Sequence, residues 1–226
     1  MTGWLPEPTR WLASGERGDH TLLAPGFQCL YLGELRGDQD RSGLDALIAH
    51  YKRSPLDIEV SSGRGRARAG KERAIAAVAG RLRRTFGAAA VACTLTFVPI
   101  PSSKRPGHPQ YCDRLVRTLR LAFRGLGADV RPLLRQRVST RADHASRERL
   151  SYERLLAITE IDPAHAARPL RALAVLFDDV LTSGKHLRVA SERIRERWPA
   201  QEVIAVIVAR RALRAPPAPS VRALRA

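Results

Sequence analysis

The segment 171–187, RALAVLFDDVLTSGKHL, constrains the fold more than any other part of the chain. Its apolar run, Leu173–Phe177, predicts a buried strand that ends at two adjacent acids, Asp178 and Asp179. A Thr-Ser-Gly turn follows, and an amphipathic helix is predicted from about residue 185 to 198. A second apolar strand is predicted at 203–209. A strand, a helix and a strand in this order are typical of a parallel sheet covered by helices.

Similar segments recur along the chain. Further strands are predicted at 27–33, 93–100 and 130–134, further helices at 44–52, 71–86 and 111–125, and a strand or helix at 155–161. The stretch 61–70, SSGRGRARAG, is predicted to be a loop from its composition. We therefore predict an α/β fold with a mostly parallel sheet flanked by helices. Residues 1–70 are predicted to form an N-terminal extension or hood, 71–212 the α/β core and 213–226 a flexible tail.

Several classes of protein are disfavoured by composition. No run of about 18 apolar residues is present, so we expect no membrane span. The first 20 residues lack a basic head followed by an apolar core, so no secretion signal is expected. Three scattered cysteines, Cys29, Cys93 and Cys112, form neither a disulfide framework nor a zinc site. The histidines form no spaced ligand set. A cytoplasmic location is the simplest expectation.

The net charge of +17 indicates an anionic partner, either nucleic acid or a phosphorylated substrate. Genome composition is an alternative explanation, because only four of the 39 basic residues are lysines. Basic residues also occur in nearly every segment, and aromatic residues that stack on bases make up only 5% of the chain. Nucleic acid is therefore a possible partner, but the sequence does not favour it.

Two loops are expected to meet at the carboxyl ends of the strands, where ligands bind in open α/β sheets. They are 99–109 and 178–186. The turn at Thr182, Ser183 and Gly184 places backbone N–H groups and a helix N-terminus where they can bind a phosphate. Neighbouring carboxylates can accept hydrogen bonds from sugar hydroxyls. This pattern predicts a site for a phosphorylated sugar, whereas the alternative is a capped helix after a strand with no ligand.

Two other phosphate-handling motifs fit less well. A nucleotide-binding P-loop requires glycine five positions before its Gly-Lys pair, and Asp179 stands there. A receiver domain carries its acids near its N-terminal part, without a Thr-Ser-Gly turn directly after them. The sequence VLF-DD-VL-TSG-K-H instead resembles the phosphoribosyl pyrophosphate signature of the type I phosphoribosyltransferases. It departs from that signature at its end, where Lys185 and His186 replace a small residue and a threonine.

The resemblance implies a role for each matching residue. Asp178 and Asp179 would hold the ribose hydroxyls, and Thr182, Ser183, Gly184, Lys185 and His186 would bind the 5′-phosphate. The Pro-flanked loop FVPIPSSKRPGHP would bind pyrophosphate through Ser102, Ser103, Lys104 and Arg105. By itself, that loop would be interpreted as a plain surface turn.

The segments VPIP, 133–153 and CLYLGEL resemble the ComF-like branch of this family, without its N-terminal zinc module. The resemblance implies a mobile loop that closes over the diphosphate, carrying Arg135, Arg137, Arg141, His144 and Arg147. A disordered basic loop is the alternative. The usual Arg-Gly-Phe-Asn segment is replaced by Pro-Gly-His-Pro-Gln-Tyr, at 106–111.

The expected function follows from this resemblance. The protein would bind phosphoribosyl pyrophosphate with Mg²⁺ held by the ligand's own oxygens, without direct protein ligands, and transfer the phosphoribosyl group to an unidentified acceptor. The alternative is a non-catalytic nucleotide sensor with the same fold that binds nucleic acid or a protein partner. The oligomeric state stays open.

Overall fold

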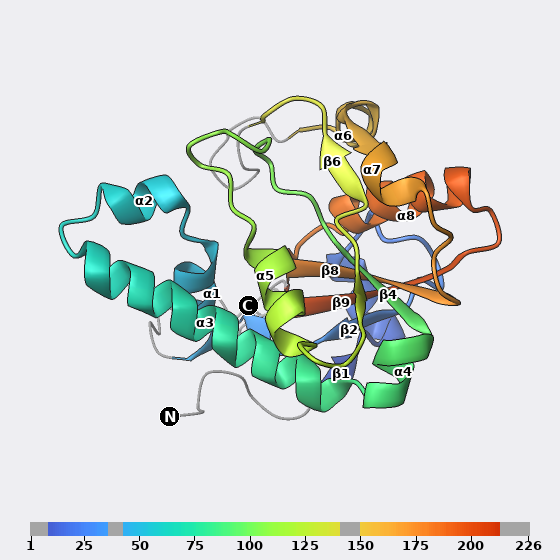
Figure 1. Ribbon diagram of the computed structural model, residues 1–226. Helices are drawn as coiled ribbons and strands as arrows, with labels where there is room; N and C mark the ends of the chain where they lie inside the picture. Colours follow the sequence, from blue (N-terminus) through green and yellow to red (C-terminus); the bar gives the residue numbers. More distant parts are fainter. Residues whose placement is uncertain (1–8, 36–42, 141–149, 213–226) are drawn as a thin grey trace, which may run out of the picture.

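The computed structural model describes residues 9–35, 43–140 and 150–212. They form a seven-stranded, mostly parallel sheet in the order β1-β2-β9-β8-β4-β5, in which β3 also pairs with β9 (Figure 1). Only β1 runs antiparallel to its neighbour. A separate antiparallel pair is formed by β6 and β7. The prediction of an α/β fold with a mostly parallel sheet flanked by helices is thus confirmed.

The elements have the following bounds. The strands are β1 Arg10–Trp11, β2 Cys29–Tyr31, β3 Glu34–Leu35, β4 Leu95–Pro99, β5 Asp129–Val130, β6 Leu134–Gln136, β7 Thr159–Ile161, β8 Leu173–Leu181 and β9 Glu202–Arg211. The helices are η1 Ser14–Asp19, α1 Leu44–Lys52, α2 Pro55–Glu59, α3 Arg64–Thr85, α4 Ala88–Cys93, α5 Arg114–Ala122, α6 Tyr152–Ile158, α7 Pro163–Ala166 and α8 Lys185–Arg197.

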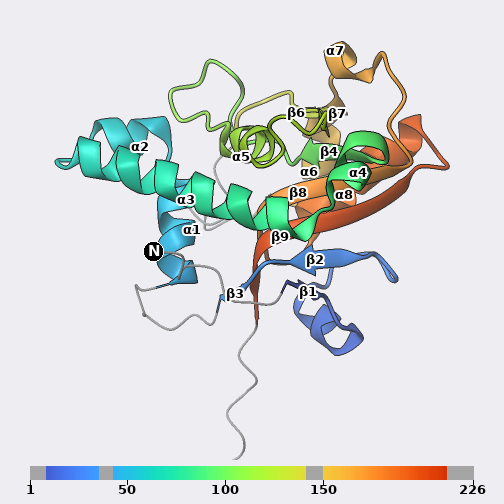
Figure 2. The same ribbon diagram turned by 60° about the horizontal axis from the view of Figure 1, so that its bottom comes forward.

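The central strands β4, β8 and β9 are buried on both faces, as is usual for parallel strands between helical layers. In their register, Leu176 lies between Val98 of β4 and Ala205 of β9. On one face, α3 and α5 lie side by side over the sheet (Figures 1 and 2). Phe97 and Phe123 stack there with ring centroids 4.4 Å apart, and Phe86 packs edge-on against Phe97. This aromatic cluster joins α5 to the sheet.

The sheet changes its winding direction between β4 and β8. From β4 the chain passes through α5 to β5, whereas from β8 it passes through α8 to β9, in the opposite direction. Right-handed crossovers therefore put α5 and α8 on opposite faces. At such a switch point, the loops of open α/β sheets diverge and form the crevice that binds their ligands.

Three sequence expectations require correction. The predicted loop 61–70 is wrong from Arg64 onward, because α3 begins there and buries Ala67 and Gly70. The strand that was expected to end at Phe177 continues to Leu181, since the long strand β9 supplies backbone partners that far. The predicted strand 130–134 is interrupted at Pro132, so β5 joins the main sheet and β6 joins the hairpin with β7.

The expectations for two of the helices agree with the structure. The helix predicted at 44–52 is α1, and the helix predicted at 185–198 is α8, one residue shorter. Strands β2 and β3 pair with β9, so residues on both sides of the 70/71 boundary contribute to one sheet. Among the described residues, no helix combines the length and apolarity that a membrane crossing requires.

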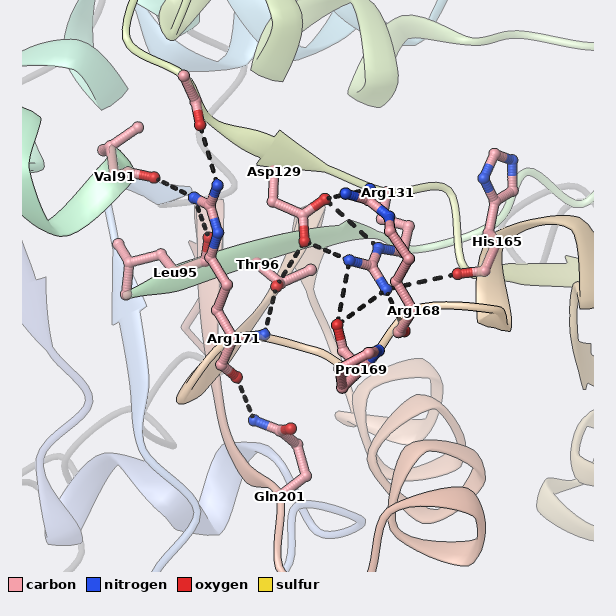
Figure 3. Close-up of polar contacts among 11 residues, drawn as sticks. Val91, Leu95, Thr96, Asp129, Arg131, His165, Arg168, Pro169, Arg171 and Gln201 are labelled. Carbon is pink, nitrogen blue, oxygen red and sulfur yellow. Dashed lines mark hydrogen bonds and ion pairs between the residues drawn. The ribbon is translucent and has the colours of Figure 1, made fainter. Parts of the chain in front are cut away.

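A buried polar cluster lies near the amino ends of β4 and β8, away from the crevice (Figure 3). Asp129 accepts hydrogen bonds from Thr96 at 2.9 Å and from Arg131 at 2.5 Å. Arg131, only 4% exposed, also donates to the carbonyl oxygen of Arg168 at 2.7 Å. Arg171 donates to the carbonyl oxygen of Val91 at 2.8 Å. The cluster thus holds the segment that enters β8 against β4 and β5.

Candidate functional site

The acidic pair lies within β8 and does not follow it. Because successive side chains of a strand point to opposite faces, Asp178 and Asp179 leave the sheet in opposite directions. Asp178 is partly exposed, whereas Asp179 is buried. The two carboxylates therefore have different surroundings and can serve different roles.

Asp179 points toward the α5 face and is held by two cations. Arg114 Nε donates to its Oδ2 at 3.1 Å, with a second, closer contact from Arg114 Nη2, and Lys52 Nζ lies 3.5 Å from Oδ1. Burial alone would raise the pKa of Asp179, but Arg114 and then Lys52 hold this pKa below its ordinary value. Asp179 is thus an ionised carboxylate whose charge is already neutralised within the protein.

Asp178 has the opposite character. Burial, and then the negative charge of Asp179, raise the pKa of Asp178 well above its ordinary value. Its Oδ1 accepts a hydrogen bond from the backbone N–H of Asp179 at 2.8 Å. Asp178 is therefore the carboxyl group of the pair that can exchange a proton near neutral pH.

The turn between β8 and α8 packs against the N-terminal segment. Leu22 donates its backbone N–H to the carbonyl oxygen of Ser183 at 2.9 Å, and the His20 ring is hydrogen-bonded to the carbonyl oxygen of Thr182. Gly184 precedes α8 in the left-handed region, with φ 83°. The carbonyl side of the predicted phosphate-binding turn is thus covered by residues 20–23.

Sequence reasoning gave His20 no role, although it belongs to a buried polar cluster. Arg210 of β9 donates to His20 Nε2 at 3.3 Å and pairs with Glu16, Asp19 and Glu34 at 2.7–2.8 Å. Burial lowers the pKa of His20, and the hydrogen bond to Thr182 opposes this only in part. No local sequence signal identifies the cluster, because His20 and Arg210 are 190 positions apart.

The residues of the predicted phosphate-binding segment differ in their exposure to solvent. Lys185 is buried, and its ammonium group donates to the carbonyl oxygen of Leu150, just before α6. His186 is partly exposed, and so is Ser183, whereas Thr182 is exposed. The charge of Lys185 thus ties α8 to the segment that enters α6.

The loop after β4 begins directly beside the acidic pair. Pro99 is in register with Phe177, and Ile100 donates its backbone N–H to the Phe177 carbonyl oxygen at 2.9 Å. Ser102 accepts a hydrogen bond from the backbone N–H of Lys104 at 3.2 Å. The loop from β4 therefore leaves the sheet beside Phe177, whereas β8 continues to Leu181 before its turn begins.

The same loop contacts the start of the predicted mobile loop. Arg105 donates its backbone N–H to Ser139 Oγ at 3.1 Å, and Thr140 donates its backbone N–H to the Ser103 carbonyl oxygen at 2.8 Å. Residues 103–105 and 139–140 are thus joined, although about 35 positions separate them. These contacts bring two of the predicted site segments together.

A pocket of about 210 Å³ lies beside this junction. Four residues of the predicted site line it, namely Ser102, Lys104, Arg105 and Arg135. Apolar side chains of α5 and acidic Asp113 and Asp162 also line it. The aspartates of β8 and the turn at 182–184 are not among its lining residues. The pocket therefore contains residues that the sequence predicts to bind pyrophosphate, and the acidic pair lies outside it.

The residues of the predicted mobile loop are held by hydrogen bonds or fall outside the described residues. Arg135 donates to Glu160 at 2.7 Å across the β6–β7 hairpin, and Arg137 donates to the Ala157 carbonyl oxygen at 2.5 Å. Arg141, His144 and Arg147 lie outside the described residues. Over the part of the chain that the structure describes, no group of three or more His, Cys, Asp or Glu side chains is arranged to hold a metal ion.

Gly184 should not tolerate a side chain. A Cβ at this position would lie 2.5 Å from Leu23 Cγ and 3.1 Å from the Leu23 backbone nitrogen, and the positive φ disfavours L-residues. Gly184→Ala is expected to lower the free energy of unfolding by about 1–3 kcal/mol, or roughly 2–12 °C in Tm. Thermal unfolding measures this.

Gly80→Ala is the matched control for Gly184→Ala. Gly80 lies inside α3, and its nearest neighbour to an added Cβ is Arg84 Nη1 at 3.6 Å. This control should be neutral or stabilise by about 0.5–1 kcal/mol. An unchanged Tm for Gly184→Ala would contradict the close packing of the turn against Leu23.

The fold and site define an α/β protein with two polar loops at the point where its sheet changes direction. Comparison with known proteins finds no matching family model and no matching curated protein. The assignment of a function therefore depends on the residues themselves.

Proposed function

We propose that this protein is a phosphoribosyltransferase-like protein that binds phosphoribosyl pyrophosphate and transfers its phosphoribosyl group to an acceptor. The observation that carries this proposal is the register of β4 and β8. It brings the start of the loop that carries Ser102, Ser103, Lys104 and Arg105 beside Phe177, the residue before Asp178. Open α/β sheets bind ligands at this position.

Separate groups of residues would bind the three parts of the substrate, namely the ribose, the 5′-phosphate and the pyrophosphate. Asp178, the partly exposed carboxyl group, would accept hydrogen bonds from the ribose hydroxyls. The exposed Thr182 and partly exposed Ser183, before the N-terminus of α8, would bind the 5′-phosphate. Lys104, Arg105 and Arg135, which line one pocket, would bind the pyrophosphate. Asp179 would position Arg114 and β8 without contacting the sugar.

In this reaction, the bond between ribose C1 and the pyrophosphate oxygen breaks, and a bond from C1 to the acceptor forms. Positive charge builds up on the ribose ring while negative charge builds up on the leaving pyrophosphate. The pocket cations would stabilise the leaving group, because fixed charges there need no reorganisation during the reaction. Mg²⁺ held by the oxygens of the ligand itself would neutralise the diphosphate when bound. Asp178 would orient the ring.

Asp178→Asn is expected to abolish the thermal stabilisation by phosphoribosyl pyrophosphate. A ligand at about 100 times its dissociation constant stabilises the native state by roughly 2.7 kcal/mol. For a chain of this length, this corresponds to a rise in Tm of about 5–11 °C. We expect this rise in wild type with Mg²⁺ present. In Asp178→Asn it should shrink below about 2 °C, because the amide replaces an oxygen acceptor by a donor.

Glu202→Gln serves as the control, since Glu202 is exposed at the amino end of β9, away from the crevice. This control should retain the full rise in Tm. Absence of a rise in wild type, or the same rise in Asp178→Asn, would contradict the proposed site.

A second candidate is a non-catalytic sensor of a phosphorylated nucleotide. Two observations favour it, namely the neutralisation of Asp179 by Arg114 and Lys52 and the burial of Lys185. Measurement of pyrophosphate release with a panel of bases and amines distinguishes the two. A transferase releases one pyrophosphate per product, whereas a sensor is stabilised by the ligand without release.

A further inference from the structure

The outer face of α3 carries an array of unneutralised arginines. The helix has seven arginines and one lysine but only one acid, Glu72, which pairs with Arg117 of α5 at 2.6 Å. Arg66, Arg73 and Arg84 are exposed and have no ion pair with any carboxylate of the described residues. The charges of these three arginines therefore face solvent, whereas Lys71 and Arg81 of the same helix are buried.

Helix α8 is also rich in arginine, but two of its arginines have carboxylate partners. An arginine-rich composition alone therefore does not explain the unpaired arginines of the outer face of α3. Its Arg188 pairs with Glu192 at 3.2 Å, and its Arg193 pairs with Glu196 at 2.6 Å. Carboxylates thus accompany arginines on one long helix but are missing from the outer face of the other. Arg66, Arg73 and Arg84 of α3 thus lack the carboxylate partners that α8 provides for Arg188 and Arg193.

The arginines of α3 share one face because of their spacing. Successive residues of an α-helix are 100° apart, so Arg66, Arg73 and Arg84 point within about 20° of one another. The positions between them on this face are small: Ala69, Ala76, Ala77 and Gly80. We call these seven residues the α3 outer face. It is opposite the side that packs on the core through Ile75, Val78 and Leu82.

The dimensions of the α3 outer face fit a regular polyanion. At 1.5 Å per residue, Arg66 and Arg84 are about 27 Å apart along the helix. Duplex DNA carries one phosphate per about 3.4 Å of each strand, so a duplex of that length offers several phosphates to each arginine. Small residues between the arginines let the helix backbone approach closely, and a helix has the width of the major groove.

Other anionic partners fit this face less well. Binding to single strands relies on aromatic side chains that stack on bases, and the α3 outer face has none. An interfacial membrane helix needs large apolar side chains such as Trp, Phe or Leu, and this face offers only alanine and glycine. We propose that the α3 outer face binds the phosphate backbone of a nucleic-acid duplex, independently of base sequence.

Fluorescence anisotropy with a 30-base-pair DNA duplex tests this proposal between 50 and 200 mM salt. The key variant is Arg66→Gln/Arg73→Gln/Arg84→Gln, in which three phosphate contacts are removed. Each contact contributes about 0.9 to the slope of log affinity against log salt. The variant should therefore show a slope smaller by about 2.7, so the fall in affinity over this salt range shrinks by about fortyfold.

The matched control removes three exposed arginines from elsewhere, as Arg154→Gln/Arg195→Gln/Arg197→Gln. It carries the same net charge as the key variant and should keep the wild-type slope. An equal loss in both triple variants would overturn the proposal, since total charge alone would then explain the binding. No duplex binding by wild type at 50 mM salt would overturn it as well.

Three further probes identify the partner. A duplex RNA of the same sequence shows whether both kinds of duplex bind, and binding of either supports a backbone site. Tighter binding to a 30-nucleotide single strand, or to phosphatidylserine vesicles, would overturn the duplex assignment.

The α3 variant should retain its stabilisation by phosphoribosyl pyrophosphate, because the α3 outer face is separate from the crevice. The two proposals can thus fail independently.

Discussion

Replacing Asp129 by alanine is expected to lower the free energy of unfolding by about 3–5 kcal/mol, because it leaves the buried guanidinium of Arg131 without its counter-charge. Both side chains are at least nine-tenths buried, and they share several hydrogen bonds with Thr96 and the 168–169 backbone (Figure 3). The corresponding fall in Tm is roughly 6–20 °C for a chain of this length. Urea unfolding measures the loss in free energy of unfolding, and thermal unfolding measures the fall in Tm.

Two variants test the cause of this loss. Glu72→Ala breaks the exposed pair with Arg117 and should cost less than about 1 kcal/mol. Asp129→Ala combined with Arg131→Met should recover part of the loss, because it removes the uncompensated charge. A double variant as unstable as the sum of the single variants would show that the charge pair is not the origin of the effect.

Arg114→Met should produce the second large loss, about 3 kcal/mol at neutral pH. It leaves the buried Asp179 carboxylate with Lys52 as its remaining cation, 3.5 Å away. Because Lys52 remains, the loss in free energy of unfolding should lie at the lower end of the range that is usual for breaking a buried ion pair. Urea unfolding at neutral pH measures it, and Arg120→Met, an exposed arginine on the same helix, is the control.

The pH dependence of this loss follows from the lowered pKa of Asp179. In wild type, the folded state holds this carboxylate ionised, so the stabilisation is present above the ordinary carboxyl pKa of about 3.9. It is lost as pH falls toward the lower folded-state pKa, because protonation then breaks the pair. The difference between wild type and Arg114→Met should therefore narrow as pH falls below about 4. If the difference in free energy of unfolding between the two proteins grew as pH fell, Asp179 and Arg114 would not form an ionised pair.

The site also shows why adjacent carboxylates need not act alike. Asp178 and Asp179 are neighbours in the chain, but strand geometry turns them to opposite faces of the sheet. Asp179 has Arg114 and Lys52 within 4.0 Å, whereas Asp178 has its neighbour's backbone N–H and its neighbour's negative charge. This difference makes Asp178 the better target for a ligand and Asp179 the better target for a stability measurement.

The order of strands and helices was predictable because it depends on local periodicity. The helix at 44–52 and the strand-turn-helix unit at 173–197 follow from the spacing of apolar residues and from glycine at the turn. The loop expected at 61–70 failed because its glycines are poor helix formers and typical signals of a loop. There, tertiary packing of Ala67 and Gly70 outweighs local preference.

The sequence by itself determined that this chain forms a parallel α/β sheet with polar loops at one edge, since strand and helix periods are written in neighbouring residues. Only the tertiary structure decided the partners of those polar groups. Arg114 reaches Asp179 across 65 positions, and His20 reaches Thr182 across 162. Such pairings depend on distances in space that no local pattern encodes, and they decide which predicted residues are held by partners within the fold and which stay exposed.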